Sequence, residues 1–445
     1  MPEQTPPDLS DDALGSEPGR QPGALEAFLR LAGAKLSLEN QKELEAEMRA
    51  ELQANQADFF MAAGFEQMPA EEKAALHKSI AAWQTASAQL DAATSFDHLA
   101  EPLAQAQGAG HLAAVLNAAL RLDVAENPQH KAKPISFKLL NYYAFHKGEK
   151  RYRTFLVPKK TPGQTREIKA PDHGLRRLQR LLLRCLTAAF TTCDQAAHGF
   201  VPGRSVLTNA QPHAGRRFVL NLDLENFFPS TAVGRVVKVL QLAPFHLSKP
   251  VAHLVASLCC DRGSLPQGAP TSPLLTNAVC QRLDRRLRQL ATRHRCTYTR
   301  YADDLTFSSN RPAFREDFHR ELTAILTLEG YRQNEQKQRL QTPQQRQEVT
   351  GIVVNERTNV PREYVRQIRA MLHNWETKGY EAASATLRQH YATSKAHARH
   401  QGKMPKLERV LAGKIAYLGM IEPTKEHYNK LLAKLNQVKK KQKLS

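Results

Sequence analysis

Alternating apolar and polar positions predict short strands in the middle of the chain. Residues 218–224 read Phe-Val-Leu-Asn-Leu-Asp-Leu, and residues 297–301 and 305–308 are rich in β-branched and aromatic side chains. Both patterns are typical of strands. We therefore predict an antiparallel hairpin with its turn inside residues 301–304, beside a strand that covers residues 218–224.

Helical spacing dominates the rest of the pattern. Apolar residues recur every three or four positions between residues 24 and 122, which predicts a domain of four or five helices. Residues 1–22 hold almost no large apolar side chains, so we expect a disordered acidic tail there. Pro273 is placed to begin another helix, and the helical pattern returns after Pro361.

Charge is divided unevenly along the 445 residues, whose net charge is +20. Residues 1–130 carry 8 Lys or Arg against 20 Asp or Glu, and the remaining residues carry 55 against 23. The basic excess favours a partner with a phosphate backbone and binding that weakens as salt rises. The acidic N-terminal part favours contact with the chain's own basic face or with a protein partner.

Membrane insertion is not expected. No apolar run approaches the ~20 residues of a transmembrane helix, and no basic-then-apolar signal opens the chain, so we expect a cytoplasmic protein without membrane contact. The six cysteines show no paired metal-finger spacing, and we interpret them as reduced core residues.

Three aspartates fall in the predicted strands and their turn. Asp303 and Asp304 are adjacent, and Asp223 lies in an apolar strand that can bring it opposite Asp303. Close carboxylates repel each other and are tolerated best beside a divalent cation, usually Mg²⁺ where the substrate is a phosphate. Two Mg²⁺ ions would activate an attacking hydroxyl and stabilise a leaving pyrophosphate, which is nucleotidyl transfer. The alternatives are a polar hairpin turn and a buried basic partner for Asp223.

A loop rich in Gly and Pro, residues 264–273, precedes the helix that Pro273 begins. Asp223, the Leu265-Pro266-Gln267-Gly268 loop and Tyr301 to Asp304 together resemble, in this order, the palm motifs of reverse transcriptases. The resemblance implies an α+β right-hand polymerase with fingers, a palm with an antiparallel sheet, a helical thumb and an added N-terminal α-helical domain. We place the boundaries at 1–22 for the tail, 23–128 for the helical domain, 129–345 for fingers and palm, and 346–445 for the thumb.

The same resemblance gives roles to individual residues. It implies metal ligands at Asp223, Leu224, Asp303 and Asp304, and nucleotide contacts at Gln267, Gly268, Lys159, Lys160 and Arg166. It implies a proton donor at Lys337, and at Phe228 an aromatic ring that excludes the ribose 2′-hydroxyl. The alternatives are a solvated basic hairpin, an exposed lysine and a core phenylalanine.

Two further elements narrow the resemblance. Asn209-Ala210-Gln211-Pro212-His213 matches the Asn-Ala-x-x-His element of retron reverse transcriptases, and Val349-Thr350-Gly351 matches their Val-Thr-Gly element. From this resemblance we predict RNA contacts at Asn209, His213, Val349, Thr350 and Gly351. An ordinary loop histidine and a β-turn are the alternatives for short matches of this kind.

A retron enzyme implies RNA-directed DNA synthesis from deoxynucleoside triphosphates on a dedicated structured non-coding RNA. It further implies priming from an RNA 2′-hydroxyl, a branched RNA-linked single-stranded DNA (msDNA), defence against phage, and an effector protein that contacts the N-terminal helical domain. Alternatives are a group II intron-like or diversity-generating reverse transcriptase, and an RNA-binding scaffold without catalysis. The three intact aspartates disfavour the scaffold.

Overall fold

The computed structural model describes residues 85–130, 133–158, 165–392, 405–421 and 426–444. The chain divides into two compact units, Met1–Ala82 and Trp83–Ser445. The predicted acidic tail and most of the predicted helical domain lie outside the described residues, as do Lys159 and Lys160.

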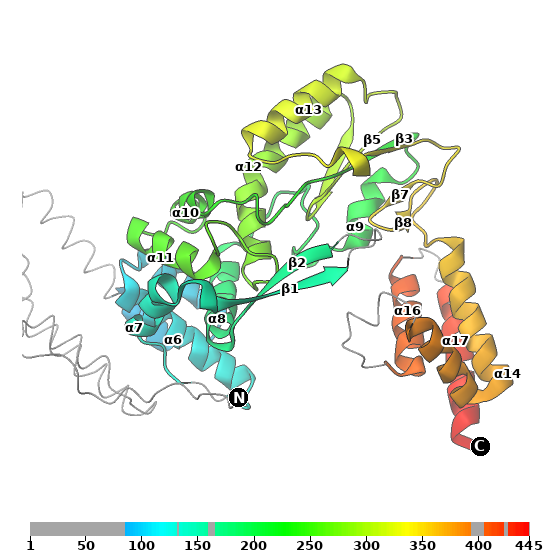
Figure 1. The fold of residues 1–445 in the computed structure, drawn as a ribbon, viewed down its shortest axis with the longest axis horizontal. Helices are drawn as coiled ribbons and strands as arrows, with labels where there is room; N and C mark the ends of the chain where they lie inside the picture. Colours follow the sequence, from blue (N-terminus) through cyan, green and yellow to red (C-terminus); the bar gives the residue numbers. More distant parts are fainter. Residues whose placement is uncertain (1–84, 131–132, 159–164, 393–404, 422–425, 445) are drawn as a thin grey trace, which may run out of the picture. The chain divides into compact units, whose positions relative to one another are not determined.

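The first part of the described chain combines helices with one hairpin, and its helices up to residue 126 fall in the range expected as the N-terminal helical domain. The helical elements are η2 (Phe96–Leu99), α5 (Ala100–Gln105), α6 (Ala109–Glu126), α7 (Phe137–Asn141), the π-helical η3 (Tyr142–His146), η4 (Gly148–Arg151) and α8 (His173–Ala189). Strands β1 (Tyr152–Pro158) and β2 (Thr165–Pro171) pair antiparallel and extend away from these helices (Figure 1). Strand β1 is largely exposed, and β2 is exposed over its first three residues.

The core of this region also contains α5 and α6. Leu103 and Leu116 lie in the same buried cluster as Leu178 and Leu182 of α8. The domain border expected near residue 128 therefore does not coincide with a border between compact units, which lies between Ala82 and Trp83. Helix α8 covers the apolar stripe of α6.

The central part is a four-stranded antiparallel sheet with helices. The strands are β3 (Phe218–Asp223), β4 (Thr297–Tyr301), β5 (Asp304–Ser309) and β6 (Arg339–Gln341), in the order β4-β5-β3-β6. The helical elements are α9 (Val206–Ala210), η5 (Gln211–His213), α10 (Val233–Gln241), α11 (Lys249–Cys259), α12 (Ser272–Arg293), α13 (Glu316–Leu328) and η6 (Glu335–Lys337).

Helices α12 and α13 supply the apolar side chains that pack on this sheet. Leu287 of α12 and Phe318 of α13 share one buried cluster with Leu220 of β3 and Phe307 of β5. Pro273 lies in the first turn of α12, as predicted, because its ring suits that position and its missing N–H is not needed there. The sheet and its helices confirm the predicted α+β class.

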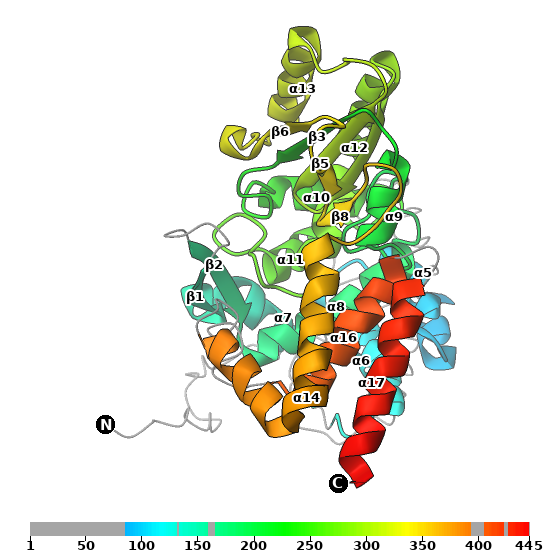
Figure 2. The ribbon, with the colours of Figure 1, turned by 90° about the vertical axis from the view of Figure 1, so that its right-hand side faces the viewer.

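The last part is a small hairpin followed by a helical unit. Its elements are β7 (Glu348–Val349), β8 (Ile352–Val353), α14 (Arg362–Ala392), α16 (Leu407–Ile421) and α17 (Glu426–Leu444). The three helices lie side by side (Figure 2) and share a core with Val219 of β3. The long α14 is interrupted at Gly379, whose φ of 82° is not helical. No helix in the described part of the chain is long and apolar enough to cross a membrane.

Candidate active site

The two adjacent aspartates lie where β4 turns into β5. Tyr301 pairs with Asp304, so Ala302 and Asp303 form a two-residue turn and Asp304 opens the second strand. Ala302 is buried and has a φ of 56°. Residues other than glycine rarely adopt this backbone conformation, and those that do cluster at functional sites. The predicted hairpin is confirmed.

The third aspartate ends the neighbouring strand. Asp223 of β3 is paired with Asp304 of β5, and the Leu224 N–H donates to the Asp303 carbonyl at 3.0 Å. Asp223 thus lies directly opposite Asp304, whereas the sequence pattern favoured Asp303. The antiparallel register brings all three carboxylates to one end of the sheet.

The protein raises the pKa values of the two adjacent carboxyls. Burial first, and then the charges of Asp303 and Asp223, raise the pKa of Asp304 to about 7. Burial and Asp223 also raise the pKa of Asp303. A divalent cation would stabilise the negative charge that these clustered carboxylates disfavour. The oxygen ligands therefore fit Mg²⁺.

Lys337 pairs with the carboxylate of Asp223. Its Nζ donates to both carboxylate oxygens of Asp223, each at 2.8 Å, from the turn η6. In the described part of the chain, no three His, Cys, Asp or Glu side chains converge as ligands of one ion. A cation held by all three aspartates would compete with Lys337 for the carboxylate of Asp223. Leu224 can contribute only its main-chain carbonyl, because its side chain is apolar and buried.

The glycine of the predicted nucleotide loop allows the loop to touch the hairpin of the fingers. The Lys169 N–H of β2 donates to the Gln267 carbonyl at 2.9 Å. Gly268 has a φ of 127°, and a Cβ there would lie 2.8 Å from the Lys169 carbonyl oxygen. Arg166, also on β2, is exposed, and its charge favours the ionised form of Asp303. The nucleotide loop therefore contacts β2, and Arg166 of β2 lies near enough to the catalytic turn for its charge to act on Asp303.

Phe228 follows the catalytic strand and is half-buried. Its ring centroid lies 5.4 Å from that of Phe227 and 6.2 Å from that of Phe200. A ring that is only partly covered is available to a ligand, whereas its neighbour Phe227 is buried. Phe228 is therefore neither a fully buried core residue nor a freely exposed surface residue.

A buried ion pair supports the catalytic turn, and sequence reasoning missed it. Arg300 of β4 is fully buried, and its guanidinium donates to both carboxylate oxygens of Asp284, at 2.8 and 2.7 Å. Tyr298 donates its hydroxyl to the same carboxylate at 2.8 Å. The signals in the sequence were an arginine inside a strand and an aspartate at helical spacing from Cys280 and Leu287, but neither names the other as its partner.

The structure encloses the two polar residues of the Asn-Ala-x-x-His element. Asn209 and His213 are each 0% exposed. The His213 ring nitrogens lie 2.7 Å from the Ser308 hydroxyl and 2.8 Å from the Thr299 hydroxyl, so this ring is held inside the palm. Direct RNA contact by these two side chains is therefore contradicted here, and both support the packing of the sheet.

The two elements of the retron resemblance meet in space. The Asn209 amide donates to the Thr350 hydroxyl at 3.5 Å, although the two residues are 141 positions apart. Thr350 and Gly351, at φ values of 48° and 85°, form the two-residue turn between β7 and β8. Val349 is buried, so only the turn itself reaches the surface.

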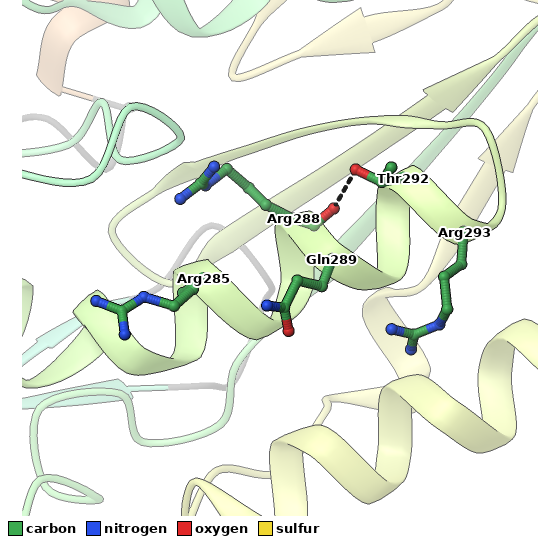
Figure 3. A pocket seen from close by; sticks show the side chains of 5 residues that line it. All are labelled: Arg285, Arg288, Gln289, Thr292 and Arg293. Atoms are coloured by element: carbon green, nitrogen blue, oxygen red, sulfur yellow. Dashed lines mark hydrogen bonds between the residues drawn. The ribbon is translucent and has the colours of Figure 1, made fainter.

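One surface hollow lies on α12, and sequence reasoning did not predict it. Its volume is 430 Å³, and Figure 3 shows its lining residues Arg285, Arg288, Gln289, Thr292 and Arg293 on a single helix. Arg288 already binds Asp194, and Arg293 already binds Glu321. None of the catalytic aspartates lines this hollow, so it is not the active site.

Another hollow lies beside the aspartates. Its volume is 310 Å³, and it is lined by Glu225, Gln333, Asn334, Glu335 and Gln336. The Asn334 N–H donates to the Asp223 carbonyl at 2.8 Å, which fixes this segment and the following Lys337 against β3.

Comparison with known proteins agrees with this geometry. The reverse transcriptase (RNA-dependent DNA polymerase) family profile matches residues 157–354, which contain all three aspartates.

Three similar individual proteins are retron reverse transcriptases. The Retron Mx65 reverse transcriptase of Myxococcus xanthus is 39% identical, and the match covers 65% of this chain and 66% of the relative. The Retron Mx162 reverse transcriptase of the same organism is 38% identical, with 58% and 60% covered. The Retron Ec86 reverse transcriptase of Escherichia coli is 35% identical, with 55% and 76% covered. The chain thus spans less than two thirds of the length of the two Myxococcus relatives.

Proposed function

Because the chain belongs to the reverse transcriptases of the retron type, we propose that it copies RNA into DNA by nucleotidyl transfer at Asp223, Asp303 and Asp304. The observation that carries this proposal is the β3–β5 register, which gathers three carboxylates at one end of the sheet. The raised pKa values of two of them support binding of a divalent cation there.

Each neighbouring group has a place in the reaction. Asp223, Asp303, Asp304 and the Leu224 carbonyl would hold two Mg²⁺ ions, which activate the attacking hydroxyl and stabilise the leaving pyrophosphate. The Lys337 Nζ lies next to Asp223, and once Lys337 leaves this carboxylate its Nζ would be placed to donate a proton to the pyrophosphate.

The loop and the hairpin would receive the nucleotide. Arg166 of β2 contributes positive charge near Asp303. Gln267 and Gly268 anchor the nucleotide loop to β2. Phe228, partly covered and next to the catalytic strand, would close the space beside the sugar and so select deoxynucleotides. Lys159 and Lys160 remain proposed triphosphate contacts from the sequence resemblance.

The relatives support a narrower proposal. The matched proteins are named retron reverse transcriptases, so we assign this chain a dedicated structured RNA, priming from an RNA 2′-hydroxyl, an msDNA product and a role in phage defence. The N-terminal helices would contact an effector protein. The basic excess beyond residue 130 suits a large RNA partner.

A single substitution tests the catalytic site. Asp303→Asn removes one anionic ligand while it keeps the shape of the turn, so primer extension on an RNA template with Mg²⁺ should fall by about three orders of magnitude or more. RNA binding and the melting temperature should stay near those of the wild type. Near-normal extension by this variant would refute the assignment of the two metal ions.

The nucleic acid that co-purifies with the protein tests the narrower proposal. Sequencing should find one short RNA joined to single-stranded DNA. Mixed cellular RNA without DNA, from a preparation that still extends a primed template, would leave a reverse transcriptase that is not a retron enzyme.

A further inference from the structure

Phe200 combines two unfavourable features. Its side chain is 52% exposed, and its φ of 61° lies in the left-handed region that bulky residues rarely adopt. An exposed aromatic ring contributes little to the core, and glycine would take this backbone conformation without strain. Strained residues of this kind are found mostly at functional sites.

The segment before Phe200 is fixed to the catalytic hairpin. The His198 N–H donates to the Arg300 carbonyl at 2.7 Å, and the Asn277 side chain donates to the Gly199 carbonyl at 2.9 Å. A Cβ on Gly199 would lie only 2.5 Å from the Ala302 nitrogen of the catalytic turn. The backbone therefore has little freedom to carry the Phe200 ring elsewhere.

The ring of Phe200 contacts the aromatic residue proposed to select the sugar. The two ring centroids, of Phe200 and Phe228, are 6.2 Å apart with their planes at 47°. Phe227 contacts the Phe228 ring at 5.4 Å. Phe228 therefore has one buried aromatic neighbour and one exposed aromatic neighbour, both of which limit its motion.

We propose that Phe200 is a positioning residue for sugar selection, which holds the Phe228 ring against the space that a ribose 2′-hydroxyl would need. The proposal rests on the proposed polymerase function and on Phe228 as the residue beside the sugar. The backbone of Phe200 is strained because the ring stands at this point of a loop that the catalytic hairpin fixes.

Substitution by glycine separates this role from a structural one. Phe200→Gly removes the backbone strain, so the melting temperature should stay the same or rise. The same change removes the ring that holds Phe228, so the ratio of kcat/KM for deoxynucleotides to that for ribonucleotides should fall, by roughly tenfold, the low end of what a lost pocket contact gives. A purely structural residue would not move this ratio while stability is kept.

Three variants complete the experiment, which uses the full chain on a primed RNA template. Phe228→Ala should lower the ratio most, and Phe200→Tyr, which keeps the ring, should leave it near the wild-type value. Arg295→Gly is the matched control, because Arg295 is another exposed residue at positive φ, here 54°, and lies at the opposite end of β4 from the catalytic turn. It should change stability in the same direction and leave the ratio unchanged.

The outcomes are distinct. If the wild type extends the primer and Phe228→Ala lowers the ratio, but Phe200→Gly does not, the role of Phe200 is refuted while the polymerase stands. An unchanged ratio in Phe228→Ala refutes the role of both rings. Absence of extension by the wild type refutes the proposed function itself, and the inference with it.

Discussion

Arg300 is fully buried three residues before Asp303, and the Asp284 carboxylate balances its charge. Its guanidinium also donates to the Asn277 side chain at 3.1 Å and to the Ala302 carbonyl at 3.3 Å. A buried pair is poor evidence for net stability, because desolvation offsets much of the attraction. Its position between α12 and the catalytic turn indicates that it fixes the direction of that turn.

We therefore expect Asp284→Asn to reduce both stability and activity. The change leaves the Arg300 charge buried without a counter-charge, which costs about 3–5 kcal/mol. Chemical denaturation and primer extension measure the two effects. Glu426→Gln, which breaks an exposed pair with Lys430, is the control and should cost less than about 1 kcal/mol.

A double variant tests whether the pair positions the turn. Asp284→Leu with Arg300→Met replaces two charges by apolar groups and should recover most of the lost stability. Extension should remain low, because the hydrogen bond to the Ala302 carbonyl is gone. Recovery of both properties would show that the pair has no positioning role.

At the scale of elements, the contact between the nucleotide loop and β2 depends on Gly268. Alanine there places a Cβ 2.8 Å from the Lys169 carbonyl oxygen, and φ is 127°, so the loop or the hairpin must move. We expect Gly268→Ala to raise the KM for deoxynucleotides by roughly tenfold or more, because displacement of a positioning element by an ångström costs that much or more.

Gly263 provides the matched control for this prediction. It lies five residues earlier at a φ of 82°, and a Cβ there would meet nothing within 4 Å. Gly263→Ala should therefore show only the strain of the backbone, about 1 kcal/mol of stability, with an unchanged KM. Equal effects of both alanines on KM would mean that strain, not the lost contact with β2, is responsible.

The sequence predicts individual elements of the palm but not the charged pairs between them. The hairpin of β4 and β5, the strand β3 and the start of α12 are confirmed, because alternation and proline signals are local. The Arg300–Asp284 and Lys337–Asp223 pairs join residues 16 and 114 positions apart. Only the folded backbone decides which charges meet, so no local pattern could name these partners.

At the scale of the molecule, three apolar clusters organise the described residues. One joins α6 to α8, another joins α12 and α13 to the sheet, and a third joins α14, α16 and α17 to Val219 of β3. The first cluster crosses the boundary expected near residue 128, and the sequence could not show this contact because an amphipathic helix does not state which neighbour covers its apolar face. The Asn209–Thr350 contact lies beside the third cluster and links the palm to the hairpin of β7 and β8.

The surroundings of His111, His198 and His213 disfavour the charged form of each ring. Burial lowers the pKa of His111 and of His198 to about 4, and that of His213 to about 3. In the unfolded chain each titrates near its ordinary value of about 6.5. Between these values the unfolded state binds more protons than the folded state. The stabilisation is therefore complete above about pH 6.5 and decreases as the pH falls toward 4.

His213→Gln should weaken this pH dependence. A group that stays neutral in the folded state contributes up to about 1.4 kcal/mol per pH unit, so the loss of unfolding free energy between about pH 6.5 and about pH 5 should be smaller in the variant by about 1–2 kcal/mol. The variant also starts lower at about pH 7.5, since it disturbs the hydrogen bonds to Thr299 and Ser308, each worth about 1 kcal/mol. Urea denaturation across this range measures both effects.

Comparison of the pH slopes of the variant and the wild type cancels the contributions of Asp303 and Asp304, whose raised pKa values act in the opposite direction. Parallel slopes would mean that His213 is protonated in the folded protein and would refute this prediction.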